Sequence, residues 1–100
     1  MEIVNAISKV RFASTAPQHV HLARGDSFRV DLLCMEAGQK SLPAAGPCAY
    51  YVVAGSAMLT ASEPHPLPAG QLAQLAPGET HTIANASQNR LICLVIRAAE

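Results

Sequence analysis

The sequence predicts an all-β domain, either a sandwich or a barrel. Short strand-like runs recur along most of the chain, and most of them are bounded by Gly, Pro, Asn or Ser. Several runs alternate apolar and polar residues with a period of two, which is typical of strands with one buried face. One hundred residues are enough for one modest core, so we expect a single domain over residues 1–100.

The N-terminal residues predict the only helical structure. Ile3, Val4, Ile7 and Val10 have near-helical spacing, which indicates one or two helical turns before an extended segment at residues 10–13. No helical pattern follows them.

The clearest strand begins at Phe28. Even-numbered residues from Phe28 to Cys34 are apolar and alternate with Arg29 and Asp31, which is typical of a strand whose even-numbered face points inward, and Leu33 and Met35 then make both faces apolar. Further strands are predicted at residues 19–22, 49–54, 57–60, 71–75, 81–84 and 91–96. The proline-dense residues 62–68 fit only a sheet edge or a turn.

Composition excludes several classes of partner. Seven basic residues balance seven acidic ones and 14% of the chain is charged, which indicates a small neutral ligand or another protein rather than nucleic acid. The longest apolar runs are too short to cross a membrane, and the first residues do not resemble a signal peptide. We therefore expect a cytoplasmic protein, with Cys34, Cys48 and Cys93 as reduced thiols.

An ordered set of short motifs runs from Asp31 to Ile96. In chain order they are Leu33-Cys34-Met35-Glu36-Ala37-Gly38-Gln39, Tyr50-Tyr51-Val52-Val53-Ala54-Gly55, Leu67 to Gly70, and Gly78-Glu79-Thr80-His81 with Asn85. This set resembles a small single-domain cupin of the RmlC-like, conserved-barrel type. The resemblance implies a jelly-roll barrel, or double-stranded β-helix, with a short N-terminal helical turn.

Cupins usually have two motifs that supply three histidines and a glutamate to one metal ion. The second motif is present here, because Gly70, Gly78, His81 and Asn85 are all in register with it. The resemblance therefore places His81 inside the barrel.

The first metal motif is degenerate. Counting back from Gly55 places Cys48 at the glutamate position and Leu42 and Ala44 at the histidine positions. Anchoring on Gly38-Gln39 instead places Ala44 and Gly46 at the histidines. Three of the four expected ligands are missing in either alignment.

The candidate ligand-binding residues are those that the resemblance and strand alternation direct into the barrel. They are His81, Cys48, Tyr50, Leu42 and Ile83. His81 is either a functional polar group or a structural histidine satisfied by one hydrogen bond. Together with Cys48 it forms the only candidate metal pair inside the barrel, although free cysteine usually packs as a small hydrophobe.

His19 and His21 form a separate His-x-His pair. On a strand both rings point to one face, as a metal site requires. Because they precede the first motif, on an N-terminal edge strand, a polar outer face is the alternative. His65 lies between two prolines and indicates a surface position.

Three functions follow from these features. The first is a metal-free or metal-poor barrel, without cofactor, that binds a small, mostly apolar molecule. The second is a divalent-metal oxygenase or isomerase that uses His81 with non-standard ligands. The third is a dimeric structural or interaction module without a ligand. The sequence does not decide whether the protein is an enzyme, and a homodimer is expected under all three.

Overall fold

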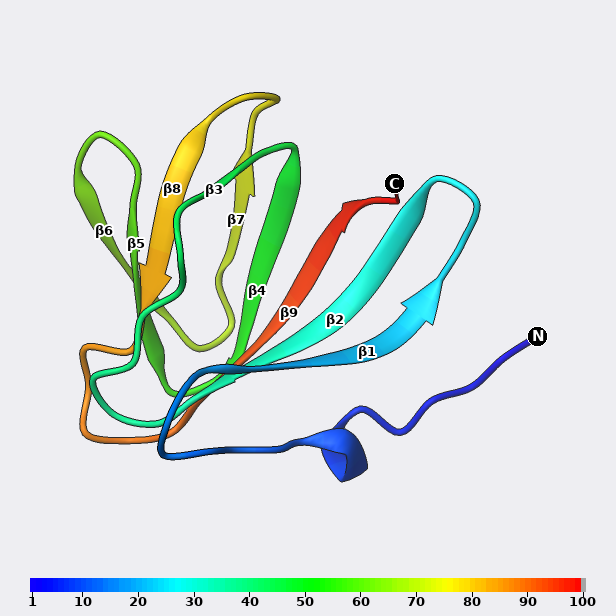
Figure 1. The fold of residues 1–100 in the computed structure, drawn as a ribbon, viewed down its shortest axis with the longest axis horizontal. Coiled ribbons are helices and arrows are strands. Elements are labelled where there is room, and N and C mark those ends of the chain that lie inside the picture. The colour runs from blue at the N-terminus through cyan, green and yellow to red at the C-terminus, as the bar shows by residue number, and fades with distance from the viewer. Residues whose placement is uncertain (100) are drawn as a thin grey trace.

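The computed structural model describes residues 1–99 as an almost entirely β-stranded fold (Figure 1). One short 3-10 turn, η1, covers Ile7–Lys9. The strands are β1 Gln18–Arg24, β2 Phe28–Met35, β3 Ala44–Ala45, β4 Cys48–Ala54, β5 Ser56–Thr60, β6 Pro64–Pro68, β7 Leu72–Leu75, β8 Thr80–Ala84 and β9 Leu91–Ala98. The predicted fold class and the N-terminal helical turn are both confirmed.

The strands form two antiparallel sheets. One sheet has the order β1-β2-β9-β4-β7, and the other has the order β3-β8-β5-β6. They occupy opposite sides of the molecule in Figure 1. The chain crosses between them at Gly55, where φ is +84° and an added Cβ would lie 2.4 Å from the carbonyl oxygen of Arg90.

The core fills the space between the two sheets. Its side chains come from both sheets and are at most 7% exposed. They are Leu33, Met35, Tyr50, Val52, Ala57, Leu59, Leu67, Leu75, Ile83, Leu91, Cys93 and Val95. Alternation on β4 places Tyr50 in this core and leaves Tyr51 37% exposed, as expected for neighbours on opposite faces of a strand.

The inward face of β2 is the opposite of the predicted one. Leu33 and Met35 lie in the core, so the same face of β2 also carries Arg29 and Asp31 toward the space between the sheets. Phe28 lies on the outer face and is 46% exposed. The predicted inner face was wrong because both faces of β2 carry apolar residues, so the alternation alone did not identify the inner one.

Two short strands lie at the edges of the smaller sheet; β3 was not predicted, whereas β6 matches the edge alternative for residues 62–68. β3 has only two residues and forms by pairing Ala44 and Ala45 with β8. β6 pairs with β5 and contributes Leu67 to the core, while His65 is exposed. Proline is tolerated here because β6 has no neighbour on its other side, as the edge interpretation of this segment requires.

Two further features concern residues 1–99 as a whole. Cys34, Cys48 and Cys93 are free thiols, as predicted. Within this part of the chain, no helix is long and apolar enough to cross a membrane.

Candidate functional site

A hollow of about 220 Å³ opens between the two sheets. Its lining comes from β1, β2, β4, β8, β9 and the segment that contains β3. The lining residues are His19, Leu33, Ser41, Leu42, Pro43, Ala44, Tyr50, Ile83 and Arg97. A neighbouring hollow of about 340 Å³ shares His19, Ser41 and Leu42 with it and adds Ala16, Pro17 and Lys40.

His81 lies beside this hollow and is buried, as predicted. Its Nδ1 is 3.1 Å from the carbonyl oxygen of Glu79, which can only accept, so Nδ1 carries a proton. In the neutral ring, Nε2 then accepts a hydrogen bond from the Tyr50 hydroxyl at 2.8 Å. The two rings also meet edge to face, with centroids 5.4 Å apart. Both ring nitrogens of His81 are therefore already engaged within the protein.

Cys48 is the third member of this cluster. Its Sγ is 3.7 Å from Nε2 of His81. Burial raises the pKa of the Cys48 thiol above its ordinary value of 9.0, against the smaller lowering effects of Tyr50 and Arg97. Cys48 is therefore a neutral thiol near pH 7, rather than the activated thiolate that a catalytic nucleophile requires.

These residues do not fit the metal centre expected of a cupin. Ala44, which pairs with His81 across β3 and β8, and Leu42, which is 86% exposed, have hydrocarbon side chains without a donor atom and supply no ligand. Among residues 1–99, no three His, Cys, Asp or Glu side chains lie close enough together to hold a metal ion. A metal at His81 would also displace the Tyr50 hydrogen bond.

His19 and His21 point to the inner face of their sheet, not to a polar outer face. β1 is an edge strand, as expected, but it pairs His19 with Leu33 and His21 with Asp31, and residues directly opposite on paired strands share a face. Both residues are nevertheless exposed, so the pair is solvent-facing as the alternative expected, but on the face that the pairing with β2 assigns to the inside of the sheet. The two histidines lie at the open rim of the barrel.

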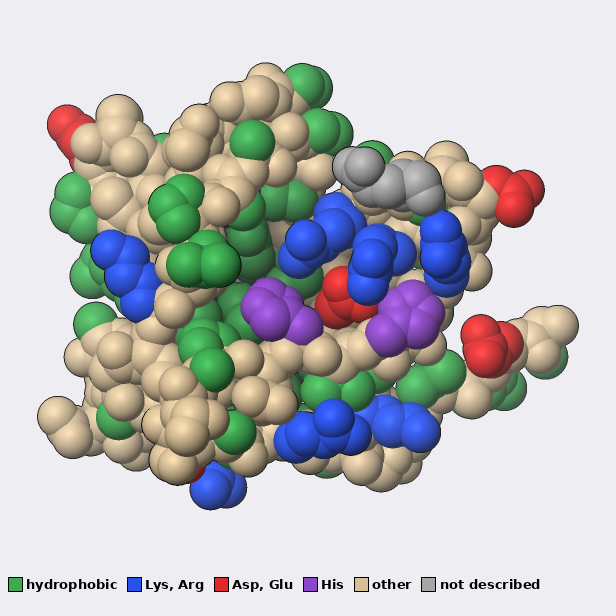
Figure 2. All heavy atoms as spheres, viewed as in Figure 1, with side chains coloured by type: hydrophobic (Ala, Val, Ile, Leu, Met, Phe, Trp, Pro, Cys, Tyr) green, Lys and Arg blue, Asp and Glu red, His purple; other side chains and the backbone are tan. Residues whose placement is uncertain are grey.

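At this rim, Asp31 joins a compact polar cluster. His21 Nδ1 lies 3.1 Å from Asp31 Oδ1, and Arg29 Nε lies 3.2 Å from Asp31 Oδ2. Asp31 itself is 4% exposed, so this carboxylate is shielded and fully engaged. Figure 2 shows histidine, acidic and basic side chains gathered on this face, beside a hollow with hydrophobic walls.

Among the lining residues that were not predicted, three are polar, namely His19, Ser41 and Arg97. Arg97 stands opposite Cys48 on β4 and opposite Arg29 on β2, on the inner face of β9. The sequence could have predicted the position of Arg97. Residues 93, 95 and 97 alternate on one face of the last strand, so Arg97 shares the apolar inner face with Cys93 and Val95.

The other predicted lining residues divide between wall and rim. Tyr50 and Ile83 form buried walls of the hollow. Leu42 lies at its mouth, where the side chain is largely exposed. Cys48 lines a separate, shallower depression of about 290 Å³ on the side of Pro47 and Gln74.

Solved structures match nearly the whole chain. The protein TT1209 from Thermus thermophilus is 22% identical, with a TM-score of 0.91 over 98% of this chain and 97% of its own. An RmlC-like cupin from Desulfovibrio desulfuricans is 19% identical, with a TM-score of 0.83 over 98% and 96%. The chain has the cupin fold.

A Klebsiella pneumoniae protein with a double-stranded β-helix domain agrees with this assignment. It is 19% identical, with a TM-score of 0.86 over 100% of this chain and 98% of its own. No protein-family model and no curated protein matches the chain. At these identities, the likeness to the solved structures establishes the fold and leaves the chemistry to the residues of the site.

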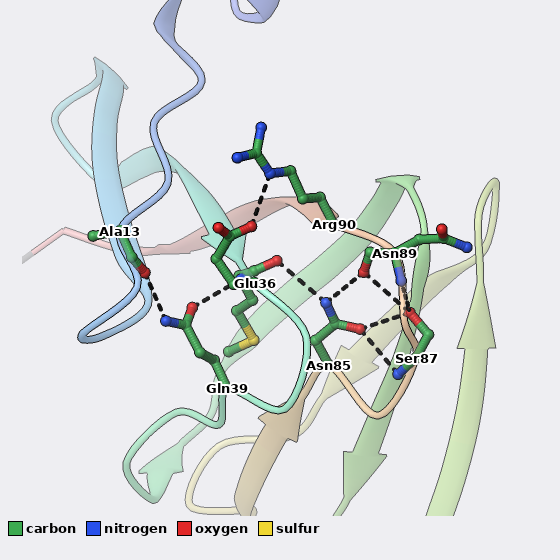
Figure 3. Close-up of polar contacts among 8 residues, drawn as sticks. Ala13, Glu36, Gln39, Asn85, Ser87, Asn89 and Arg90 are labelled. Carbon is green, nitrogen blue, oxygen red and sulfur yellow. Dashed lines mark hydrogen bonds and ion pairs between the residues drawn. The ribbon is translucent and has the colours of Figure 1, made fainter.

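Two cupin motif residues hold loops together at one end of the barrel (Figure 3). The buried Asn85 amide donates to the carbonyl oxygens of Met35 and Asn89, at 3.2 and 2.7 Å, and its oxygen accepts from the backbone N–H and hydroxyl of Ser87. Gln39 accepts from the Glu36 N–H and donates to the Ala13 carbonyl. These contacts give the motif residues a structural role that needs no metal.

Proposed function

We propose that this cupin is a metal-poor barrel that binds a small, mostly apolar organic molecule in the hollow between its sheets. One observation carries the proposal: the hollow has a largely apolar wall with a few polar groups, the usual makeup of small-molecule sites. Its volume of about 220 Å³ lies below the roughly 300–1,000 Å³ typical of sites for drug-sized ligands, so a smaller molecule fits.

In this proposal, Tyr50 is a rigid polar group in the wall of the hollow, and His81, which does not line the hollow, holds it from behind. The Glu79 carbonyl fixes the His81 ring, and His81 in turn fixes the Tyr50 hydroxyl, which lines the hollow. Fixed polar groups cost little entropy when a ligand binds, which favours selective binding.

A metalloenzyme has less support. The residues at the metal positions leave only Cys48 and His81, a thiol with a raised pKa and an imidazole with both nitrogens engaged. A catalytic transition metal usually needs three protein ligands.

Filling the hollow tests the proposal. Ala44 lines the hollow from β3, and the adjacent Ala45 alternates to the other face. We expect Ala44→Phe to abolish the thermal stabilisation produced by hits from a small-molecule screen, and the matched Ala45→Phe to keep it. Equal stabilisation of both variants would contradict binding in this hollow.

We further propose that the chain forms a homodimer through the outer face of its five-stranded sheet. Cross-strand pairing places Tyr51 beside Leu72, and the same face carries Phe28 and Ile96. These four side chains are 37%, 61%, 46% and 39% exposed, a concentration of apolar surface that association would cover.

Sedimentation velocity over a range of concentrations tests the dimer. We expect the wild type to sediment as a dimer and Leu72→Lys to shift it toward monomer. Ile7→Lys, a charge change at an exposed residue of η1, is the matched control and should leave the dimer intact. A monomeric wild type would contradict the proposal.

A further inference from the structure

Arg97 is a partly buried cation that the described protein does not satisfy. Its Nε is inaccessible to solvent and has no hydrogen-bond partner within residues 1–99. Nε of the neighbouring Arg29 also lacks a hydrogen bond of good geometry, but it lies 3.2 Å from the Asp31 carboxylate in an ion pair. Within the described residues Arg97 has no such carboxylate, although it lines the hollow.

Two carboxylates on or next to the strands around the hollow, those of Asp31 and Glu79, already have partners. Asp31 is held by His21 and Arg29. Glu79 accepts the backbone N–H of Ala76 at 2.9 Å. No Asp or Glu lines either of the two adjoining hollows, whereas Arg97 lines one and Lys40 lines the other. Of the charged side chains, only the cations Arg97 and Lys40 therefore line these hollows, while the Asp31 carboxylate acts on His19 from outside them.

The other polar groups of the hollow can donate hydrogen bonds. The Ser41 oxygen accepts the Ile83 N–H at 3.0 Å, which leaves the hydroxyl hydrogen of Ser41 available. A neutral His19 ring carries one N–H donor, and within residues 1–99 it has no hydrogen-bond partner. Arg97 adds the donor fork of its guanidinium.

The positive charge of Arg97 affects the pKa values of three neighbouring side chains. It lowers the pKa of His19, after the larger lowering effect of burial, and it opposes the rise that burial causes in the pKa values of Cys48 and Tyr50. A cation this close to three neighbours, without a counter-ion in the described protein, disfavours the empty hollow and favours an anion within it.

We propose that the hollow binds a small monocarboxylic acid, with its carboxylate on Arg97, Ser41 and His19 and its apolar part between Leu33 and Ile83. This inference rests on the proposed ligand-binding function and specifies the chemical class of the ligand. Arg97 recognises the carboxylate with paired N–H donors. One guanidinium beside a neutral imidazole suits a single negative charge better than a phosphate dianion.

Matched pairs of probes test this assignment by isothermal titration calorimetry. The probes are monocarboxylates from propanoate to benzoate, the primary amide of each acid, and the corresponding alkylphosphonates. We expect at least one acid to bind, and its amide to bind more weakly by about tenfold or more, because a hydrogen bond to a charged group is lost.

Two variants place the effect at Arg97. Arg97→Gln should weaken the best acid by about tenfold or more and leave its amide within about twofold. Arg11→Gln makes the same change in net charge at an exposed residue outside the hollow, and should leave both affinities unchanged. Thermal melting of each variant checks that it is folded.

The outcomes separate the two proposals. Amides that bind as tightly as acids, phosphonates that bind more tightly, or an Arg97→Gln variant with full affinity would overturn the carboxylate assignment and leave ligand binding in the hollow standing. If neither acids nor amides bind to folded wild-type protein, both proposals fail.

Discussion

At the residue scale, His81 differs most from what its cupin motif implies. In the motif it is one of four metal ligands, but here its ring bridges the Glu79 carbonyl and the Tyr50 hydroxyl. Burial strongly raises the pKa of Tyr50, so the phenol stays protonated and remains a donor to His81. Tyr50 lines the hollow, and His81 behind it fixes the direction of the Tyr50 hydroxyl.

The Tyr50 hydroxyl should therefore contribute to stability. Tyr50→Phe leaves Nε2 of the buried His81 without its donor, and we expect it to lower the free energy of unfolding by about 1–3 kcal/mol. Tyr51→Phe, on the exposed face of the same strand, should cost less than about 0.5 kcal/mol. Urea unfolding of both variants measures the difference, and equal losses would contradict a structural role for this hydrogen bond.

The ionisation of His19 gives a second prediction. Burial, Arg97 and Arg29 together lower its pKa below 6.5, and Asp31 only partly opposes them. Between that lowered value and 6.5, the unfolded chain binds more protons than the folded chain, so stability at this residue falls as the pH falls through this window. Above 6.5 the contribution of His19 no longer changes with pH.

An NMR titration of the His19 ring measures this effect. We expect a midpoint below 6.5 in the wild type, and a higher midpoint in Arg97→Gln, where one lowering charge is removed. A carboxylate bound at Arg97 should raise the midpoint as well. A wild-type midpoint at or above 6.5 would contradict the lowering of the His19 pKa by burial and by the two arginines.

At the element scale, the loop after β8 depends on Asn85. Its side chain is completely buried and bonds to three other residues, which together join the end of β2 to the loop before β9 (Figure 3). Nearby, Arg90 forms an ion pair with Glu36 at 2.8 Å and covers the Phe12 ring at 4.4 Å. The loops and the N-terminal segment are tied together at this end of the barrel.

Asn85→Ala should break that connection. Several buried groups lose their partners at once, so we expect a loss of at least about 2 kcal/mol in the free energy of unfolding. Asn89→Ala is the matched control in the same loop, because only backbone atoms of Asn89 take part in the network, and it should cost about 0.5 kcal/mol or less. Thermal or urea unfolding compares the two variants.

Strand patterns predicted most of the elements but not which face of β2 points inward. On one face of β2, Leu32 and Cys34 are as deeply buried as Leu33 and Met35 are on the other. Hydrophobicity alone therefore does not distinguish the two faces of this strand. The choice depends on pairing with β9, which brings Arg29 opposite Arg97 and Leu33 opposite Cys93. Single-sequence patterns do not contain that pairing.

The same limit explains the missed parts of the site. The buried positions of His81, Tyr50 and Ile83 were predictable, because each lies within a strand whose alternation or motif register fixes its face. His19, Ser41 and Arg97 come from separate strands and loops, and only the closure of the barrel brings them to one hollow.

At the scale of the whole molecule, a net charge of zero conceals a local separation of charge. The balance predicted a neutral ligand, yet the hollows are lined by Arg97 and Lys40 without an acidic side chain. A balance over the whole chain averages over opposite charges that lie on different surfaces.

Metal content tests the central claim, that this barrel works without a metal ion, most directly. The protein is produced without a histidine tag in medium supplemented with iron, manganese, nickel and zinc salts, and analysed by inductively coupled plasma mass spectrometry. The account predicts far less than about one transition-metal ion per chain, since structural and catalytic sites need three or four ligands. About one ion per chain, lost in both His81→Ala and Cys48→Ala, would contradict it.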